Sequence, residues 1–363
     1  MGPGHLAPGA GRPEDARMRG EPAPYLTVTL TGTGPGPVAF NGIAGAGTLV
    51  RYGDATDASR TMNLQFDAGR GTTIRLSQLG IFPAQLDAVF FTHMHSDHTE
   101  GFADLVQLRW MFDGAGAKLD AIGSTDVVSR RGATLSCRSF IAHVADAFIH
   151  SGEIAQRHSE IASRSAGGPA DLINTITFTP TEEPQAVWSR RDVTVSAIRS
   201  THMAGHASYR VDTPAGSVVI GGDAGSDAVT PPRASSTSDQ VEMLASGADI
   251  IVHSAIHPAL APDRGSGFFP HAYYRQSTAA DLGAMAQRAG ARHLVLTHLI
   301  PALGAERHGP FKIPGGPLTE RDYSEAVRDG GFTGQIVVGT DLASMRLPAH
   351  ETSHASIDRK ASP

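Results

Sequence analysis

Three histidines and one aspartate lie close together in residues 92–98, Thr-His-Met-His-Ser-Asp-His, at the end of an apolar run that predicts a buried strand. Imidazole nitrogens and carboxylate oxygens suit zinc and similar borderline divalent metals. Alternate residues of an extended loop share a face, so His93 and His95 can converge on one ion while Asp97 and His98 turn towards a second. The cluster therefore predicts half of a two-metal site, and two metals usually indicate hydrolysis.

Three further candidate ligands are needed from distant parts of the chain, and each follows a short β-rich apolar run. They are His202 after residues 195–201, Asp223 after residues 217–222 and His298 after residues 293–297. A sheet can hold such side chains rigidly at its strand ends while the adjoining loops admit substrate. Burying the 93–98 cluster without a metal would leave polar groups in need of many partners, which favours a metal site.

With this pattern the chain resembles the metallo-β-lactamase superfamily, whose H-x-H-x-D-H signature is matched by residues 93–98. The ribonuclease Z and arylsulfatase-like branch is the most similar, because residues 66–72 match its Asp-x-Gly-x-Gly-Thr element and Tyr209-Arg210 match its Tyr-Arg pair. The resemblance covers roughly residues 27 to 347. It implies an α/β fold, a four-layer αβ/βα sandwich with the metals at one edge of two facing sheets.

The resemblance also implies seven metal ligands in two groups that share one carboxylate. The first ion would be held by His93, His95 and His202, the second by Asp97, His98 and His298, and both by Asp223. Two Zn²⁺ ions are expected, with Mn²⁺ or Fe²⁺ as alternatives, and a hydroxide between them would be the nucleophile. Asp97 could also orient that nucleophile or take its proton. Asp67 is expected to orient a ligand histidine, with a turn or helix-start role as the alternative.

Two departures from ribonuclease Z bear on the substrate. His253-Ser254-Ala255-Ile256 stands where that enzyme carries His-Glu-Ala-Thr, and Gln276-Ser277-Thr278 stands where it carries His-Ser-Thr. Losing the carboxylate weakens a proton relay, which argues against tRNA maturation. We keep His253 as a candidate catalytic proton donor, with a buried structural histidine as the alternative; His206, His257 and His271 are further pocket candidates.

The sequence thus predicts a dinuclear metal-dependent hydrolase that uses a metal-bridging hydroxide on a small ester-like substrate. The bond is a carboxylic ester or lactone, a phosphodiester or a sulfate ester, because one ligand set serves all of these. The alternatives are a phosphodiesterase or nuclease of ribonuclease Z type, an iron-dependent redox member of the same superfamily, and a non-catalytic binding protein.

Composition supplies the remaining expectations. The net charge of -6 gives no footprint for a long nucleic acid, so a small molecule is the expected partner. A single cysteine, Cys137, excludes an internal disulfide, and no run reaches transmembrane length, so no membrane partner is expected. We expect a soluble cytoplasmic protein, with export by a processed signal left open, and a homodimer at the level of family resemblance alone.

The ligands must be positioned by one catalytic domain over residues 26–348, between disordered tails at 1–25 and 349–363. Strands are predicted at 27–32, 46–51, 62–67 and 335–338, and helices at 72–79, around 102–112 and at 277–289 with Ser277 as the cap. Residues 113–190 are less regular and are expected to be an insertion that shapes or covers the active site as a lid.

Overall fold

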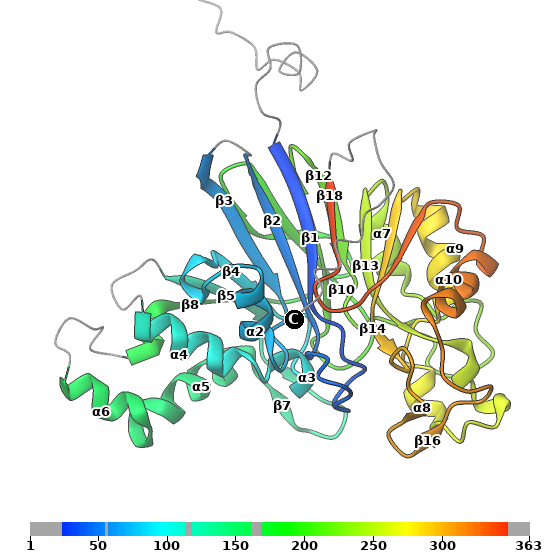
Figure 1. The fold of residues 1–363 in the computed structure, drawn as a ribbon, viewed down its shortest axis with the longest axis horizontal. Coiled ribbons are helices and arrows are strands. Elements are labelled where there is room, and N and C mark those ends of the chain that lie inside the picture. The colour runs from blue at the N-terminus through cyan, green and yellow to red at the C-terminus, as the bar shows by residue number, and fades with distance from the viewer. Residues whose placement is uncertain (1–23, 55–56, 113–117, 161–167, 348–363) are drawn as a thin grey trace, which may run out of the picture.

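Two seven-stranded sheets face each other, and helices cover the outer face of each sheet (Figure 1). This computed structural model describes residues 24–54, 57–112, 118–160 and 168–347. The arrangement confirms the predicted four-layer αβ/βα sandwich. No helix in these described ranges is both long and apolar enough to cross a bilayer.

The first sheet combines an antiparallel N-terminal part with a parallel part. Its order is β18 (Ser344–Leu347), β1 (Pro24–Gly32), β2 (Gly47–Asp54), β3 (Asp57–Phe66), β4 (Ala88–Phe90), β5 (Leu119–Ser124) and β8 (Ile173–Phe178). Strands β3, β4, β5 and β8 run parallel. The carboxyl end of β4 therefore opens into the 93–98 segment at the sheet edge where ligands bind in α/β folds.

The second sheet brings three further strand ends to one edge. Its order is β17 (Gln335–Val338), β14 (His293–Ile300), β13 (Ile250–Ile256), β12 (Gly216–Ile220), β11 (Ala207–Thr213), β10 (Val193–Arg199) and β9 (Gln185–Arg190). Strands β12, β13, β14 and β17 are parallel, and β11 is antiparallel to both of its neighbours, so β10 runs in the direction of β12. The segments after β10 and β12 and the end of β14 thus lie at the same edge.

The space between the sheets is filled by apolar side chains from both. Phe66 and Phe90 of the first sheet stack at 4.7 Å, and Tyr209 of the second sheet meets Phe90 at 5.5 Å. Each such aromatic pair contributes about 0.5–1.5 kcal/mol beyond the burial of its area. The buried Tyr209 hydroxyl also donates a 2.7 Å hydrogen bond to the Phe91 carbonyl, which fixes the chain just before the 93–98 segment.

Helices complete the outer layers. Those packed on the first sheet are α2 (Thr72–Gln78), α4 (Phe102–Phe112) and α5 (Cys137–Ser151), and those on the second are α7 (Asp239–Ala245), α9 (Ala279–Ala289) and α10 (Glu320–Asp329). Shorter helices are α3 (Ser96–Thr99), α6 (Glu153–Glu160) and α8 (Pro270–Tyr273). In α9, Leu282, Met285 and Ala286 lie at helical spacing and are buried against the sheet.

Most predicted elements are present, but the start of α9 differs. Thr278 caps this helix by accepting a hydrogen bond from the Asp281 N–H, so the prediction that Ser277 is the cap was wrong. The Ser277 hydroxyl instead donates to the Ala224 carbonyl at 2.7 Å, beside the second sheet. Strand β18 at the edge of the first sheet was not predicted.

Residues 113–190 contribute β5 and β8 to the first sheet and β9 to the second. The part between β5 and β8 holds α5, α6 and a small hairpin of β6 (Val127–Val128) and β7 (Thr134–Leu135). Its role as a lid stays a prediction. The tails expected at 1–25 and 349–363 lie outside the described residues, except for residues 24 and 25, which belong to β1.

Candidate metal centre

Ligand candidates from both sheets meet at this shared edge. The first sheet supplies residues 93–98, part of which forms α3, and the second supplies His202, Asp223 and His298. His298 lies within β14, where the pairing with β13 shifts by one residue and its φ is +45°. A bulge of this kind redirects a side chain, so this local irregularity turns His298 towards the other candidates.

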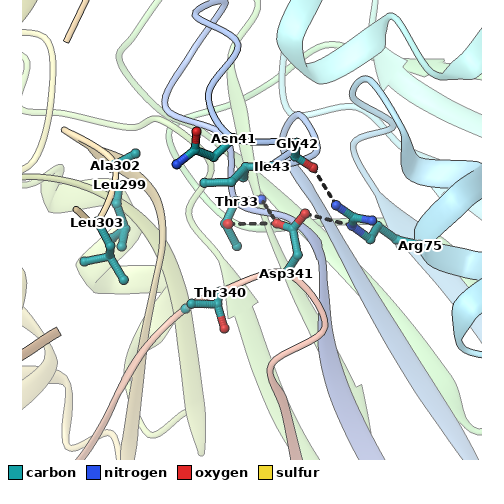
Figure 2. Close-up of a pocket in the computed structure, with 11 residues that line it drawn as sticks. Thr33, Asn41, Gly42, Ile43, Arg75, Leu299, Ala302, Leu303, Thr340 and Asp341 are labelled. Atoms are coloured by element: carbon teal, nitrogen blue, oxygen red, sulfur yellow. Dashed lines mark hydrogen bonds and ion pairs between the residues drawn. The ribbon is translucent and has the colours of Figure 1, made fainter. Parts of the chain in front are cut away.

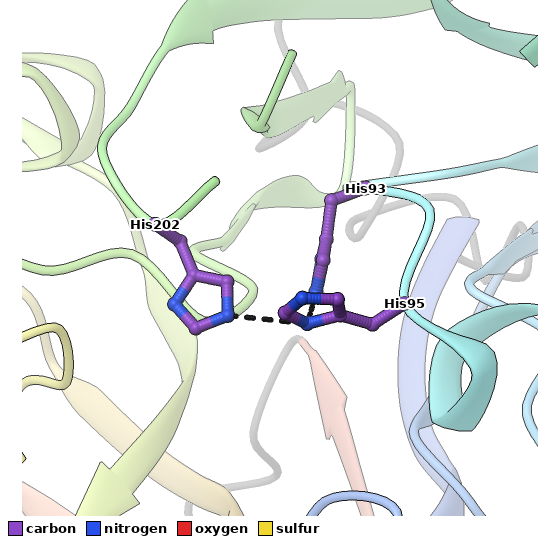
Figure 3. A group of neighbouring side chains, drawn as sticks. All are labelled: His93, His95 and His202. Atoms are coloured by element: carbon purple, nitrogen blue, oxygen red, sulfur yellow. Dashed lines mark hydrogen bonds between the residues drawn. The ribbon is translucent and has the colours of Figure 1, made fainter. Parts of the chain in front are cut away.

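His93, His95 and His202 form the first group (Figure 3). The Nε2 atom of His93 lies 2.9 Å from His95 Nδ1, and His202 Nε2 lies 3.3 Å from the same atom. Burial lowers the pKa of His93 well below its usual value and that of His202 to about 4, so both rings are neutral at neutral pH. Neutral imidazoles with converging nitrogens are what a divalent ion requires.

Asp97, His98 and His298 form the second group. His298 Nε2 lies 3.0 Å from Asp97 Oδ2, and His98 Nε2 lies 3.5 Å from the same oxygen. Burial by itself would lower the pKa of His98, but the carboxylates of Asp67 and Asp223 outweigh burial and raise it well above its usual value. The raised pKa means that the surroundings of His98 favour a positive charge at Nε2, which either a proton or a metal ion can supply.

Asp223 lies between the two groups. Its Oδ2 atom is 3.5 Å from the Nε2 atoms of His98 and His298, and 3.8 Å from His202 Nε2. Burial would raise the pKa of Asp223, but the surrounding imidazoles, His298 first, hold it well below its usual value. An ionised carboxylate in this place can contact an ion in either group.

The donor atoms at this edge fit divalent metal ions. Among the described residues of this cluster, four atoms are buried without any hydrogen-bond partner: His98 Nε2, His202 Nδ1, Asp223 Oδ1 and His298 Nδ1. A buried polar atom without a partner costs about 1–3 kcal/mol, so four such atoms in one cluster indicate a site for a ligand. Nitrogen and oxygen donors without sulfur suit zinc, manganese and iron.

Asp67 positions both the start of the metal loop and one of its histidines. Its Oδ1 accepts from the Thr92 N–H, and its Oδ2 accepts from the Thr92 hydroxyl and from His98 Nδ1–H, each at 2.8 Å. The Thr92 hydroxyl donates its one hydrogen to Asp67. In its contact with His93 it must therefore accept, from Nδ1–H at 3.0 Å. Both histidines therefore carry their free lone pair on Nε2, towards the centre, as the orienting role predicted for Asp67 requires.

A glycine of the 66–72 element allows this close approach. A Cβ atom at Gly69 would lie 2.1 Å from the Asp97 carbonyl oxygen. The helix-start alternative for Asp67 does not hold, because the residue at the N-cap of α2 is Gly71.

A second buried network holds the turn that carries Asp223. The Asp223 N–H donates to His206 Nε2 at 3.2 Å, so His206 donates from Nδ1–H to the Ser200 hydroxyl at 2.8 Å. Ser200 in turn donates to Ser208 at 2.8 Å, and Ser208 donates to the Gly221 carbonyl at 2.8 Å. Burial, followed by the charge of His202, lowers the pKa of His206 well below its usual value, which matches this neutral tautomer.

These network residues were only partly predicted. His206 was a pocket candidate, whereas Thr92, Ser200 and Ser208 were missed. The available signal is their position: each is a polar residue at or next to the end of an apolar strand that leads to or from a candidate ligand.

A loop before β2 lies beside His298, because a Cβ atom at Gly36 would lie 3.9 Å from the His298 ring. Figure 2 shows the contacts of Asp341 that hold this loop. Asp341 accepts from the Thr33 N–H and hydroxyl, from the Ala44 N–H and from Arg75 Nε, at 2.8–2.9 Å. These bonds close one side of a cavity of about 290 Å³, whose other wall is apolar and includes Leu299, the residue after His298. The loop therefore has a fixed position next to the second group.

The remaining candidate histidines are not in either group. His253 is fully buried, donates from Nδ1–H to the Ser254 carbonyl at 2.7 Å, and packs so closely on Gly221 that an added Cβ would lie 2.1 Å from its ring. Its role as a proton donor stays a prediction that this placement does not support. His257 accepts from the Ala259 N–H, and His271 is exposed and stacks on Phe269.

Comparison with known proteins agrees with this geometry. Residues 55–298 match the family model described as the metallo-beta-lactamase superfamily. The chain belongs to the metallo-β-lactamase superfamily. Together with its relatives, this membership makes it a metal-dependent hydrolase.

Its relatives include ribonuclease Z of Mycobacterium bovis (strain BCG / Pasteur 1173P2), 29% identical over 87% of this chain and 96% of the relative. Ribonuclease Z of Mycobacterium avium (strain 104) is 28% identical over 89% of this chain and 99% of the relative. Among solved structures, the short form of human tRNase Z matches with a TM-score of 0.55 at 17% identity, over 89% of this chain and 99% of that one. A Bacillus subtilis metallo-β-lactamase fold protein matches with a TM-score of 0.54, also at 17% identity and over the same shares. These two structural likenesses show the fold alone.

The partner prediction was wrong. It preferred a small-molecule substrate to a long nucleic acid, whereas the relatives are by name enzymes of RNA. The net charge of -6 is a sum over the whole chain and does not describe the local field at a metal centre, where bound cations are the largest charges.

Proposed function

We propose that this metallo-β-lactamase superfamily enzyme hydrolyses phosphodiester bonds of RNA, in the class that the name ribonuclease Z denotes. The observation that carries the proposal is the position of Asp223 between two groups of three donors each, in a chain similar to ribonuclease Z over 87% of its length. Two ions that share one carboxylate form a clamp suited to an in-line displacement at phosphorus.

The proposed ligand assignment follows the two groups. One ion would be held by His93, His95 and His202, the other by Asp97, His98 and His298, and both by Asp223. Zinc is the expected metal, because the donors are nitrogen and oxygen atoms of borderline character. When bound, the two ions would lower the pKa of a water molecule and offset the negative charge that develops on the phosphoryl oxygens.

Asp97 is the proposed proton acceptor for the attacking water. Burial would raise its pKa, but the hydrogen bond from His298 and the nearby imidazoles lower it, so Asp97 is ionised at neutral pH. Its Oδ2 lies 3.0 Å from His298 Nε2, which orients the carboxylate at the centre.

The test combines metal analysis with turnover of three chromogenic substrates and of an unprocessed tRNA transcript. We expect about two zinc ions per chain, hydrolysis of bis-p-nitrophenyl phosphate in preference to p-nitrophenyl acetate and p-nitrophenyl sulfate, and cleavage of the transcript. RNA binding should weaken steeply with salt, because phosphate contacts release counterions. Turnover of the acetate or sulfate ester alone would overturn the proposal.

Two variants connect the activity to the centre. Asp223→Asn should remove at least one ion and nearly all phosphodiester turnover. His143→Ala, which changes an exposed histidine on α5, is the matched control and should retain both. Full turnover by Asp223→Asn would show that the chemistry occurs elsewhere.

A further inference from the structure

Arg275 lies at the same edge of the sandwich as the candidate ligands. It follows α8, and its carbonyl packs so closely on Gly225 that a Cβ atom there would lie 2.5 Å away. Gly225 follows Asp223 by two residues, and its N–H donates to the Thr201 carbonyl at 2.7 Å, directly before His202. The backbone of Arg275 is therefore fixed beside the turns that carry two of the proposed ligands.

The guanidinium of Arg275 has no protein partner among the residues that the structure describes. Its Nε atom is buried without a hydrogen-bond acceptor, and no carboxylate lies within ion-pair distance. The nearby arginines differ: Arg199 pairs with Glu182 and Asp227, and Arg233 donates to the Tyr274 carbonyl. A buried N–H without an acceptor is costly, so this donor is available to an anion that the protein does not supply.

The charge of Arg275 also acts on the first group of donors. Burial is the main cause of the lowered pKa values of His95 and His202, and the guanidinium of Arg275 lowers both further. A positive charge that acts on both rings lies within electrostatic reach of the place where His93, His95 and His202 converge.

We propose that Arg275 binds a nonbridging oxygen of the substrate phosphodiester at the side of the centre formed by His93, His95 and His202. This inference rests on the proposed function, which supplies the phosphodiester. The planar guanidinium presents several N–H donors in a fixed fork, which matches the tetrahedral oxyanion and supports two parallel hydrogen bonds. Arg275 is thus assigned as a specificity-determining residue that selects an anionic diester over a neutral ester.

The test compares the metal-loaded wild-type enzyme with the variants Arg275→Ala and Arg275→Lys. The control is Arg264→Ala, since Arg264 is an exposed arginine on the other side of α8 in the sequence. Calorimetric titration with inorganic phosphate should show binding weakened about 10- to 100-fold in Arg275→Ala, the range of a charge-assisted hydrogen bond. Arg275→Lys should recover only part of the affinity, because a point charge lacks the fork.

Metal content and the melting temperature should be unchanged in both Arg275 variants, which separates loss of the anion contact from loss of the centre. The KM for bis-p-nitrophenyl phosphate should rise by a similar factor, while turnover of neutral p-nitrophenyl acetate, where the wild type has any, should not fall. Equal phosphate affinity and equal KM in wild type and Arg275→Ala would overturn the inference and leave the proposed function standing. A wild type that binds phosphate through Arg275 but cleaves no phosphodiester would overturn the proposed function and leave Arg275 as an oxyanion site.

Discussion

The backbone N–H of Asp223 donates to Nε2 of His206 at 3.2 Å, and this bond makes His206 a support for the residue that lies between the two groups of donors. Because Nε2 accepts, His206 is neutral and its other nitrogen donates into the Ser200–Ser208 network. The turn after β12 is therefore held by side chains from β11 and from the segment between β10 and β11.

Substitution of His206 should weaken metal binding. We expect His206→Ala to lower the affinity for zinc about 10- to 100-fold, the usual effect of removing a residue that orients a metal ligand. Competition with a chromophoric chelator measures this affinity, and His143→Ala again serves as the control. Unchanged zinc affinity in His206→Ala would mean that the Asp223 turn keeps its position without the network.

The substitution Asp67→Asn should show whether this position requires two acceptor oxygens or only a side chain of this volume. Asparagine keeps the volume but offers a single acceptor oxygen, whereas Asp67 accepts three hydrogen bonds from Thr92 and His98. At least one buried donor then loses its partner, which should lower the free energy of unfolding of the metal-free protein by about 1–3 kcal/mol. Urea denaturation of the chelator-treated protein checks this value, and a loss below the error of the measurement would contradict it.

Bound metal should stabilise the protein by an amount that rises with the logarithm of the free metal concentration, so removal of the metals should destabilise it. Ions that bind only the folded state add about 4 kcal/mol when the free concentration exceeds the dissociation constant a thousandfold. Thermal melting at buffered zinc concentrations should therefore show a rising melting temperature for the wild type and a smaller rise for His95→Ala. Identical melting curves with chelator and with zinc would rule out a contribution of bound metal to the stability of the fold.

The single cysteine should be unreactive in the folded protein. Burial raises the pKa of Cys137 to about 12, so almost no thiolate exists at pH 8. The raised pKa also means that the thiol favours the folded state below its usual pKa and that this contribution is lost as the pH rises towards 12. Alkylation by iodoacetamide at pH 8 should be slow in buffer and fast in denaturant, and rapid alkylation of the native protein would disprove the assignment.

The local sequence was sufficient for the ligand candidates but not for what supports them. The 93–98 motif and the strand ends before His202, Asp223 and His298 are visible as short patterns. The contact of His206 with Asp223 and the approach of Arg275 to Gly225 join segments far apart in the chain, and no local pattern reports such packing.

The predicted start of α9 was wrong because two neighbouring residues can each cap a helix. Ser277 and Thr278 can both cap a helix, and the choice depends on the Ala224 carbonyl, which draws the Ser277 hydroxyl away. Strand β18 does alternate, with Ser344 and Arg346 exposed, but it has only four residues, the shortest run that such a pattern can mark. The partner prediction failed because the net charge of the whole chain does not describe the field at one edge of a sandwich.

The proposed ligands are divided between the two sheets: four side chains follow β4, and three come from the second sheet. Neither half of the chain by itself offers a complete set for either ion, since even the first group needs His202 from the distant half. The proposed sites can therefore bind metal only after both halves have docked during folding. Bound metal thus shows that the two sheets have come together. Expressed as two separate polypeptides, the halves would have to find each other before either could retain zinc, which makes bound metal a natural readout for split-chain complementation.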